Sequence, residues 1–179
     1  MTSKATEEDD WLRNNIFQST CIIKDKVCLF VIDGGSCKNI VSVKVIEKLN
    51  SHTEKHPKPY KLAWLKKGDQ VVVHKQALVS FSIGLKYKDV VWCDVVCMDG
   101  FHLLLGRPWQ YDRDVNHNGR TNTYSFIFDK VKIILLPSRQ VLEKPKVVGE
   151  ATALLSLARV DEDLQESEIG YRLLKKGVV

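Results

Sequence analysis

The stretch VCLFVIDGGS, residues 27–36, decides the fold. Its first six residues are all apolar, which is typical of a strand that is buried on both faces. Asp33 follows directly, and the two glycines after it let the backbone turn sharply and approach a neighbouring group. Only Asp33, among the acids of this chain, begins an Asp-x-Gly triplet. An isolated Asp-Gly-Gly is typical of a simple turn, so its meaning depends on the elements around it.

Strand-like segments recur on both sides of this stretch. They show either the composition of β-strands or the alternation of apolar and polar residues that half-buried strands require. These segments are residues 16–23, 60–65, 70–74, 79–83, 91–97, 102–105, 124–128 and 131–136. A mainly β fold is therefore expected.

The segments between the strands predict one short helix, one irregular connection and one long hairpin. Asn39 or Ser42 can cap a helix that ends near Leu49, and residues 109–113 are expected to form one helical turn. Residues 52–59 contain two prolines and are expected to be irregular. Between residues 60–65 and 70–74, Gly68 can supply the positive φ of a hairpin turn with a basic tip.

The composition is that of one globular domain with tails. The chain has 179 residues, of which 44% are hydrophobic and 27% charged, and a formal net charge of +5. Its longest apolar run is far shorter than the roughly 18 residues that cross a bilayer, and its N-terminus is polar and acidic. We therefore expect no membrane segment, no secretion signal and a cytoplasmic or nuclear location. The basic residues are scattered, so direct nucleic-acid binding is not expected.

The domain is expected to span residues 11–140. Residues 1–10 form a polar leader with too little apolar surface to offset the entropy of ordering. Residues 141–179 read as a connector or tail, since they carry Pro145 and several charges, a short amphipathic segment at 151–160 and an acidic run.

The five cysteines form an odd set without a CxxC pair, which predicts reduced, mostly structural thiols. Cys93, Cys97 and His102 have the spacing of part of a zinc knuckle, but a fourth ligand is missing and strand alternation puts both cysteines on one packing face. No metal site and no cofactor are expected. Cys37 follows the Asp-Gly-Gly turn, but no motif pairs it with a histidine base, so it is expected to be a small buried residue.

A phosphate-binding loop is a further reading of a glycine pair after a strand. Such loops end in Gly-Lys-Ser or Gly-Lys-Thr, which is absent here. Asp33 would also repel a phosphate. This reading is therefore set aside.

The order of these segments resembles the retropepsin family, the single-lobe aspartic proteases of retroviruses and long-terminal-repeat retrotransposons. The matching segments are VIDGGSCKNIVS (31–42) at the active-site loop and HLLLGRPWQYDR (102–113) at the second loop. WLRNNIFQSTC (11–21), PYKLAWL (59–65) and YSFIFD (124–129) are similar to the protease region of plant gypsy-type retrotransposon polyproteins. The resemblance covers about residues 11–140 and implies a mainly β, closed barrel with one short helix and a flap hairpin, acting as a homodimer.

The resemblance also implies a role for each candidate residue. Asp33 would be one half of a catalytic dyad, and the partner's copy the other half. The loop around it would consist of Gly34, Gly35 and Ser36. A flap over the peptide substrate would be formed by Trp64, Leu65, Lys66, Lys67 and Gly68, and structural support would come from Gly106 and Arg107. Two carboxylates about 3 Å apart cannot both ionise, so such a dyad holds one proton and acts as acid and base.

The family also implies the biological setting. Its substrates would be the junctions of the element's own polyprotein, cleaved in the cytoplasm or inside retrotransposon particles, without a metal or a cofactor. Residues 141–179 would then lead towards a reverse transcriptase that this chain does not contain.

Gly34 departs from the family pattern. Retropepsins usually have Ser or Thr here, and that hydroxyl bonds across the dimer beneath the dyad; related plant elements also carry Gly-Gly. Losing one net hydrogen bond costs roughly 1 kcal/mol. Two functions therefore stay open: an active aspartic endopeptidase, or an inactive retropepsin-like module for dimerisation or protein binding. Ser36 is close enough in sequence to supply a substitute hydroxyl.

Overall fold

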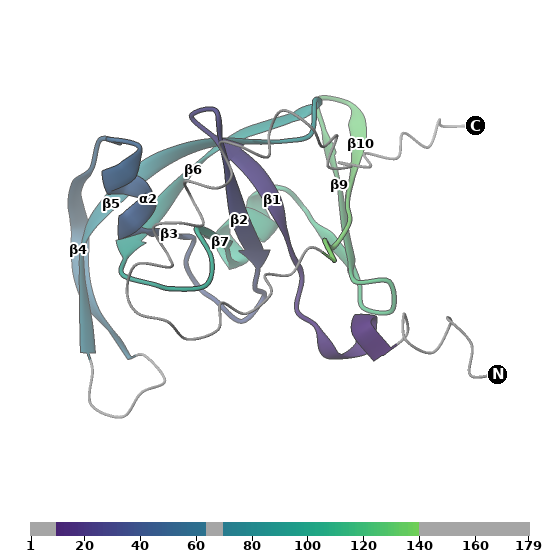
Figure 1. Cartoon of the computed structure of the whole chain (residues 1–179), viewed down its shortest axis with the longest axis horizontal. Coiled ribbons are helices and arrows are strands. Elements are labelled where there is room, and N and C mark those ends of the chain that lie inside the picture. The colour runs from purple at the N-terminus through teal and green to yellow at the C-terminus, as the bar shows by residue number, and fades with distance from the viewer. Residues whose placement is uncertain (1–9, 64–69, 140–179) are drawn as a thin grey trace.

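The structure, a computed structural model, describes residues 10–63 and 70–139 (Figure 1). The strands of the larger sheet are β1 (Gln18–Ile23), β2 (Lys26–Ile32), β3 (Ile40–Ser42), β4 (Glu54–Ala63), β5 (Gln70–Ile83), β6 (Tyr87–Val96) and β7 (Leu103–Leu105). A smaller sheet contains β8 (Asn116–Asn118), β9 (Thr123–Phe128) and β10 (Val131–Leu135). The helices are α2 (Val43–Lys48), α3 (Arg107–Asp112) and residues 10–14.

The larger sheet closes into a barrel. Its strand order is β1-β2-β7-β3-β6-β5-β4, and an additional pairing of Ile22 with Ser82 joins β1 to β5. Six strands therefore form a ring, and β4 lies outside it at the edge. The expected mainly β, closed barrel is confirmed.

The β1–β2 hairpin delivers the chain into the Asp33 loop. Lys24 and Asp25 both have positive φ, as the tight turns that match the twist of two strands require. On β2, Phe30, Val31 and Ile32 are all buried, which confirms a strand covered on both faces. Its last three residues pair in parallel with β7.

The short helix α2 begins where the sequence places it, after Ser42. The Ser42 side chain makes no capping bond; its hydroxyl donates to the Met98 carbonyl at 3.4 Å. Asn39, the other expected cap, lies before β3 and has a different use, described below. The expected turn at residues 109–113 is α3, which begins two residues earlier.

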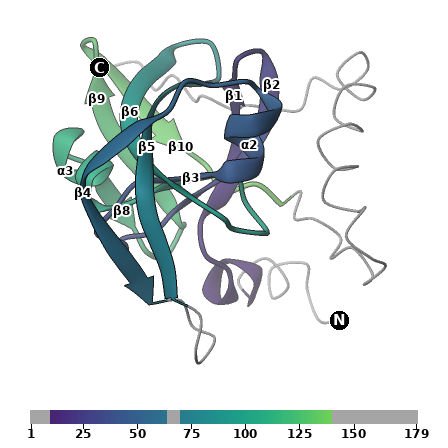
Figure 2. The same ribbon diagram turned by 90° about the vertical axis from the view of Figure 1, so that its left-hand side faces the viewer.

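The connection expected at residues 52–59 is wrong from Glu54 onward, because β4 begins there. The β4–β5 register shifts between Lys55 and Tyr60, and Pro57 and Pro59 lie in this irregular stretch. Proline is tolerated here because β4 is an edge strand and its missing N–H interrupts no inner ladder. The runs expected at 70–74 and 79–83 are parts of one strand, β5 (Figure 2).

Two apolar clusters fill the molecule. The larger one lies inside the barrel and under the smaller sheet, and includes Phe17, Tyr87 and Trp109. The second is built from Val31, Ile40, Val73, Val96, Met98 and Leu104 and packs beside the root of the β4–β5 hairpin. The strands expected at residues 124–128 and 131–136 are confirmed; they pair as the β9–β10 hairpin, with positive φ at Asp129 and Lys130. Within the described residues no helix has the length and hydropathy needed to cross a membrane.

A buried polar network joins β6 to α3. Asp89 accepts hydrogen bonds from the Tyr87 hydroxyl, from Arg113 Nε at 2.7 Å and from the Val90 amide at 2.7 Å. Trp109 Nε1 donates to the Tyr87 hydroxyl at 2.9 Å. Burial alone would raise the pKa of the Asp89 carboxyl, but the bonds from Arg113, Tyr87 and Val90 outweigh it and lower the pKa. This network fixes α3 against the barrel.

Replacing Asp89 by Asn should make the stability of the domain less dependent on acid pH. Because the folded-state pKa lies below the ordinary 3.8, the stabilisation is present above that value and is lost as pH falls through the lowered pKa. Urea denaturation of Asp89→Asn should show a loss of about 2 kcal/mol at neutral pH and a smaller difference from wild type in acid. Asp112→Asn, on the exposed side of α3, is the control. A difference that stays constant with pH would contradict this account.

Candidate active site

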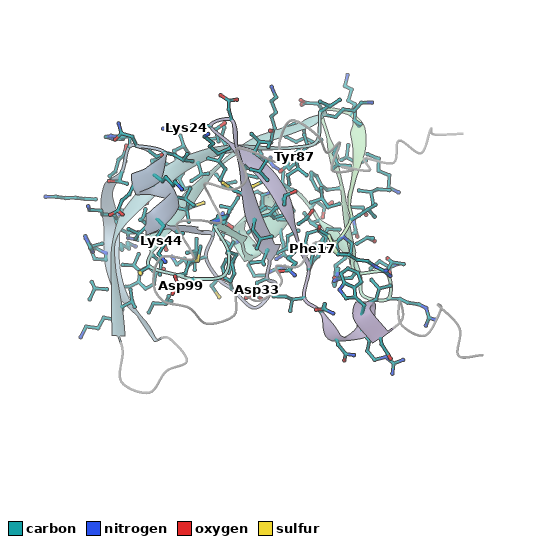
Figure 3. All side chains as sticks on the ribbon, viewed as in Figure 1. Phe17, Lys24, Asp33, Lys44, Tyr87 and Asp99 are labelled. Atoms are coloured by element: carbon teal, nitrogen blue, oxygen red, sulfur yellow. The ribbon has the colours of Figure 1, made fainter. Side chains whose placement is uncertain are left out.

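Asp33 stands at the edge of the barrel where two parallel strands end. Ile32, the last residue of β2, pairs with Leu105, the last residue of β7. The Asp33 amide donates to the Leu105 carbonyl at 3.1 Å, which continues the ladder by one bond. The side chain of Asp33 is exposed (Figure 3). The two strand ends thus place an accessible carboxylate beside Gly106.

The loop itself holds the carboxylate. The Gly35 amide donates to Asp33 Oδ1 at 2.8 Å, and the Ser36 amide donates to the Asp33 carbonyl at 3.2 Å. A Cβ on Gly35 would lie only 3.2 Å from Asp33 Oδ1, which is tighter than most real contacts. Glycine at position 35 therefore lets the backbone amide approach the carboxylate.

The Ser36 hydroxyl is used inside the same loop. It donates to the Lys38 carbonyl at 2.8 Å and accepts from the Lys38 amide at 3.3 Å. These bonds close a tight turn after the two glycines. The Ser36 hydroxyl, which the sequence suggested as a substitute for the one missing at Gly34, is therefore already bonded within its own loop.

Gly106 and Arg107 contact this loop through their main chains. The Arg107 amide donates to the Ser36 carbonyl at 2.8 Å, and its side chain is exposed. A Cβ on Gly106 would lie 2.2 Å from the Lys38 carbonyl oxygen and 2.8 Å from that of Ser36. No side chain fits there, because the obstacle is backbone. The apposition of the two loops thus requires glycine at position 106.

Asn39 is a site neighbour whose use the sequence did not reveal. Its side-chain oxygen accepts from the Gly106 amide at 2.9 Å, and its side-chain nitrogen donates to the Trp92 carbonyl at 3.4 Å. Its position inside the VIDGGSCKNIVS segment indicated that it lies near the site, but its residue type suggested a helix cap. Its buried amide instead ties β6 to the second loop.

Tyr124 is a second unanticipated neighbour. Burial raises the pKa of its hydroxyl, and the negative charge of Asp33 raises it further. The His117 ring stacks on the Tyr124 ring with centroids 4.2 Å apart. Asp33 and Tyr124 are 91 positions apart in the chain, so no local sequence pattern could have identified them as neighbours.

The β4–β5 hairpin is anchored next to the same loop. Lys38 Nζ lies 5.1 Å from the centre of the Tyr60 ring, and the Tyr60 hydroxyl donates to Asp94 Oδ2 at 2.5 Å. His56 Nδ1 accepts the Lys58 amide, so Nε2 carries the proton that faces Asp94 Oδ1 at 3.1 Å. The Asp94 amide in turn donates to the Asn39 carbonyl at 2.9 Å. The hairpin root and the Asp33 loop are therefore mechanically linked.

The expected flap residues lie outside the described residues. They are Trp64, Leu65, Lys66, Lys67 and Gly68. The strands that bear them are described as far as the pair Ala63 and Gln70. In Figure 1 the described end of the β4–β5 hairpin and the end of β2 both point downward.

The cysteines divide into buried and exposed thiols. Cys28 and Cys93 are buried, and burial raises the pKa of Cys28 to about 12, which makes it unreactive at neutral pH. The shared face expected for Cys93 and Cys97 is wrong, because Cys97 lies beyond the end of β6 and is exposed. Cys37 was expected to be buried and is exposed, since it lies in the loop before β3. Among the described residues no three His, Cys, Asp or Glu side chains converge as metal ligands.

Comparisons with known proteins identify similar structures but no sequence relatives. No protein-family model and no curated protein matches the chain. The retroviral protease-like domain of Ddi1 from Leishmania major is 11% identical, with a TM-score of 0.48 over 70% of this chain and 98% of that one. A retropepsin-like aspartic protease from Rickettsia conorii is 18% identical, with a TM-score of 0.41 over 59% and 79%. Because both scores are below 0.5, any function has to follow from this chain's own geometry.

Adding one methyl group at Gly106 should destabilise the whole domain. The new Cβ would collide with the Lys38 and Ser36 carbonyls, so Gly106→Ala should lose about 3 kcal/mol of unfolding free energy in urea denaturation. Gly119→Ala is the matched control, because a Cβ there meets nothing within 4 Å. Equal stabilities of the two variants would contradict the packing described here.

Proposed function

We propose that this chain is an aspartic endopeptidase of the retropepsin type, with an active site assembled from two copies that each contribute Asp33. The observation that carries the proposal is the exposed Asp33 carboxylate, fixed by the Gly35 amide and supported by the Gly106 turn. An aspartic protease needs two carboxylates, and this sequence has one Asp-x-Gly loop. In this proposal the second carboxylate comes from another copy.

The chemistry follows from the shared proton of such a pair. A water molecule held between the two Asp33 side chains loses a proton to the ionised carboxylate and attacks the peptide carbonyl carbon. The protonated carboxyl gives its proton to the carbonyl oxygen, which forms a tetrahedral diol. The carboxyl that took the water proton then gives it to the amide nitrogen, one diol hydroxyl returns a proton to the other carboxylate, and collapse of the diol breaks the C–N bond to release the amine and the acid. The enzyme returns to its one-proton state.

The substrate is an extended peptide covered by the β4–β5 hairpin. Hairpin closure excludes water and offers backbone groups to the substrate, as strand-addition recognition requires. The hydrogen bonds from Tyr60 to Asp94 and from Asp94 to Asn39 support a hairpin whose position is fixed relative to the Asp33 loop. The sequence resemblance supports the junctions of a gypsy-type retrotransposon polyprotein as natural targets, cleaved in the cytoplasm or in particles.

Gly34 favours a second candidate function. A Cβ at this position would meet only the Gln110 side chain, at 3.6 Å, and the backbone does not require glycine. The missing hydroxyl is therefore a departure that packing does not force. It supports a chain that forms the dimer and binds proteins without turnover.

Replacing Asp33 by Asn should abolish cleavage while leaving the dimer intact. The amide cannot act as a base, so the rate should fall on the order of 100-fold or more. The measurement is cleavage of a peptide library at mildly acidic pH, with pepstatin as inhibitor of the wild type and Asp112→Asn as control. Normal cleavage by Asp33→Asn would sink the assignment. A wild-type dimer without pepstatin-sensitive cleavage would establish the second candidate.

The two loop glycines should respond differently to alanine. In Gly35→Ala the new methyl group presses on Asp33 Oδ1, and this displacement should lower kcat roughly 10-fold. Gly34→Ala meets only ordinary contact distances and should lose less activity. The two variants are compared by steady-state kinetics, and their thermal midpoints are measured to show that both are equally folded at the assay temperature. A larger loss in Gly34→Ala would argue against the carboxylate geometry described above.

A further inference from the structure

Gln110 brings an unpaired amide to the back of the Asp33 loop. Its side-chain Oε1 and Nε2 lie 3.6 Å and 3.9 Å from the point where a Cβ on Gly34 would be. Nε2 is buried, and in the described part of the chain it is the one buried side-chain nitrogen or oxygen without a hydrogen-bond partner. Leaving such a donor unpaired costs free energy, so native proteins rarely keep one without a use.

The main chain of Gln110 is held in place by two hydrogen bonds. The Gln110 amide donates to the Gly106 carbonyl at 3.2 Å, and its carbonyl accepts from Val115 at 3.1 Å. The adjacent Trp109 is buried and bonded to Tyr87. The Asp33 loop on the other side is exposed at Gly34 and Gly35, the residues with the greatest backbone freedom.

We propose that Gln110 is a positioning residue for Asp33. When two copies associate, the loop shifts so that the Gly34 carbonyl accepts the Gln110 Nε2–H, and this bond holds the carboxylate at the dyad. This bond lies inside each copy, whereas the hydroxyl that Gly34 lacks would bond across the dimer. This inference rests on the proposed two-copy active site.

The proposal gives a signature that an ordinary packing residue would not give. In the separate chain the donor is unpaired, so Gln110→Met, which keeps the length and removes the N–H, should not lower the thermal midpoint. In the dimer the same change removes two bonds, one in each copy, so the dimer dissociation constant should rise about 30-fold. In the active enzyme kcat should fall while KM stays near the wild-type value.

The experiment measures these effects in two backgrounds. Dissociation constants from sedimentation and thermal midpoints of the dilute monomer are measured with Asp33→Asn present, which removes self-cleavage from both readings. Steady-state kinetics uses the chain with Asp33 intact. Tyr111→Phe is the control, because that side chain is on the same helix and 79% exposed. Gln110→Leu repeats the test if the Met variant does not fold.

The outcomes separate the two claims. A weaker dimer with an unchanged or raised monomer midpoint supports the positioning role. A lowered monomer midpoint, or a dissociation constant equal to that of wild type, overturns it. If the dimer weakens as expected but no variant cleaves peptide, the proposed function fails and the Gln110 bond stands. If cleavage depends on Asp33 but Gln110→Met behaves like wild type, only the present inference fails.

Discussion

The close approach of Gly106 to the backbone of Ser36 and Lys38 is the contact on which the site depends. This approach is possible because Gly106 has no side chain, and the atoms that face it are the main-chain carbonyl oxygens of Ser36 and Lys38. Around it, the Asp33 amide bonds to Leu105 and the Arg107 amide to Ser36, so the loop after β2 and the turn after β7 form one unit. The parallel pairing of β2 and β7 brings these two ends to one edge.

A chain of hydrogen bonds extends this unit to the hairpin. Asn39 bonds to Gly106 through its side chain and to Asp94 through its carbonyl, and Asp94 in turn accepts from Tyr60 and faces His56 on β4. A buried carboxylate is tolerated here because donors surround it. The hairpin root is thereby connected by hydrogen bonds to the loop that carries the carboxylate.

The sequence predicted the strands and loops whose structure depends mainly on neighbouring residues. The apolar run that forms β2 and the position of Asp33 directly after it were both readable from neighbouring residues. The prolines of β4 misled because nothing local shows that a strand lies at an edge. Long-range partners explain the other gaps: Asp94 bonds to Tyr60, 34 positions away in the chain, and α3 brings the Gln110 side chain next to Gly34.

In the proposed enzyme one chain holds half of an active site. Mixing the wild type with increasing amounts of Asp33→Asn, under conditions where subunits exchange, tests it most directly. If each site needs Asp33 from both copies, cleavage per wild-type subunit should fall in proportion to the wild-type fraction, because mixed dimers are inactive. Cleavage per wild-type subunit that stays constant across the mixtures would show that a single chain suffices and would contradict the account.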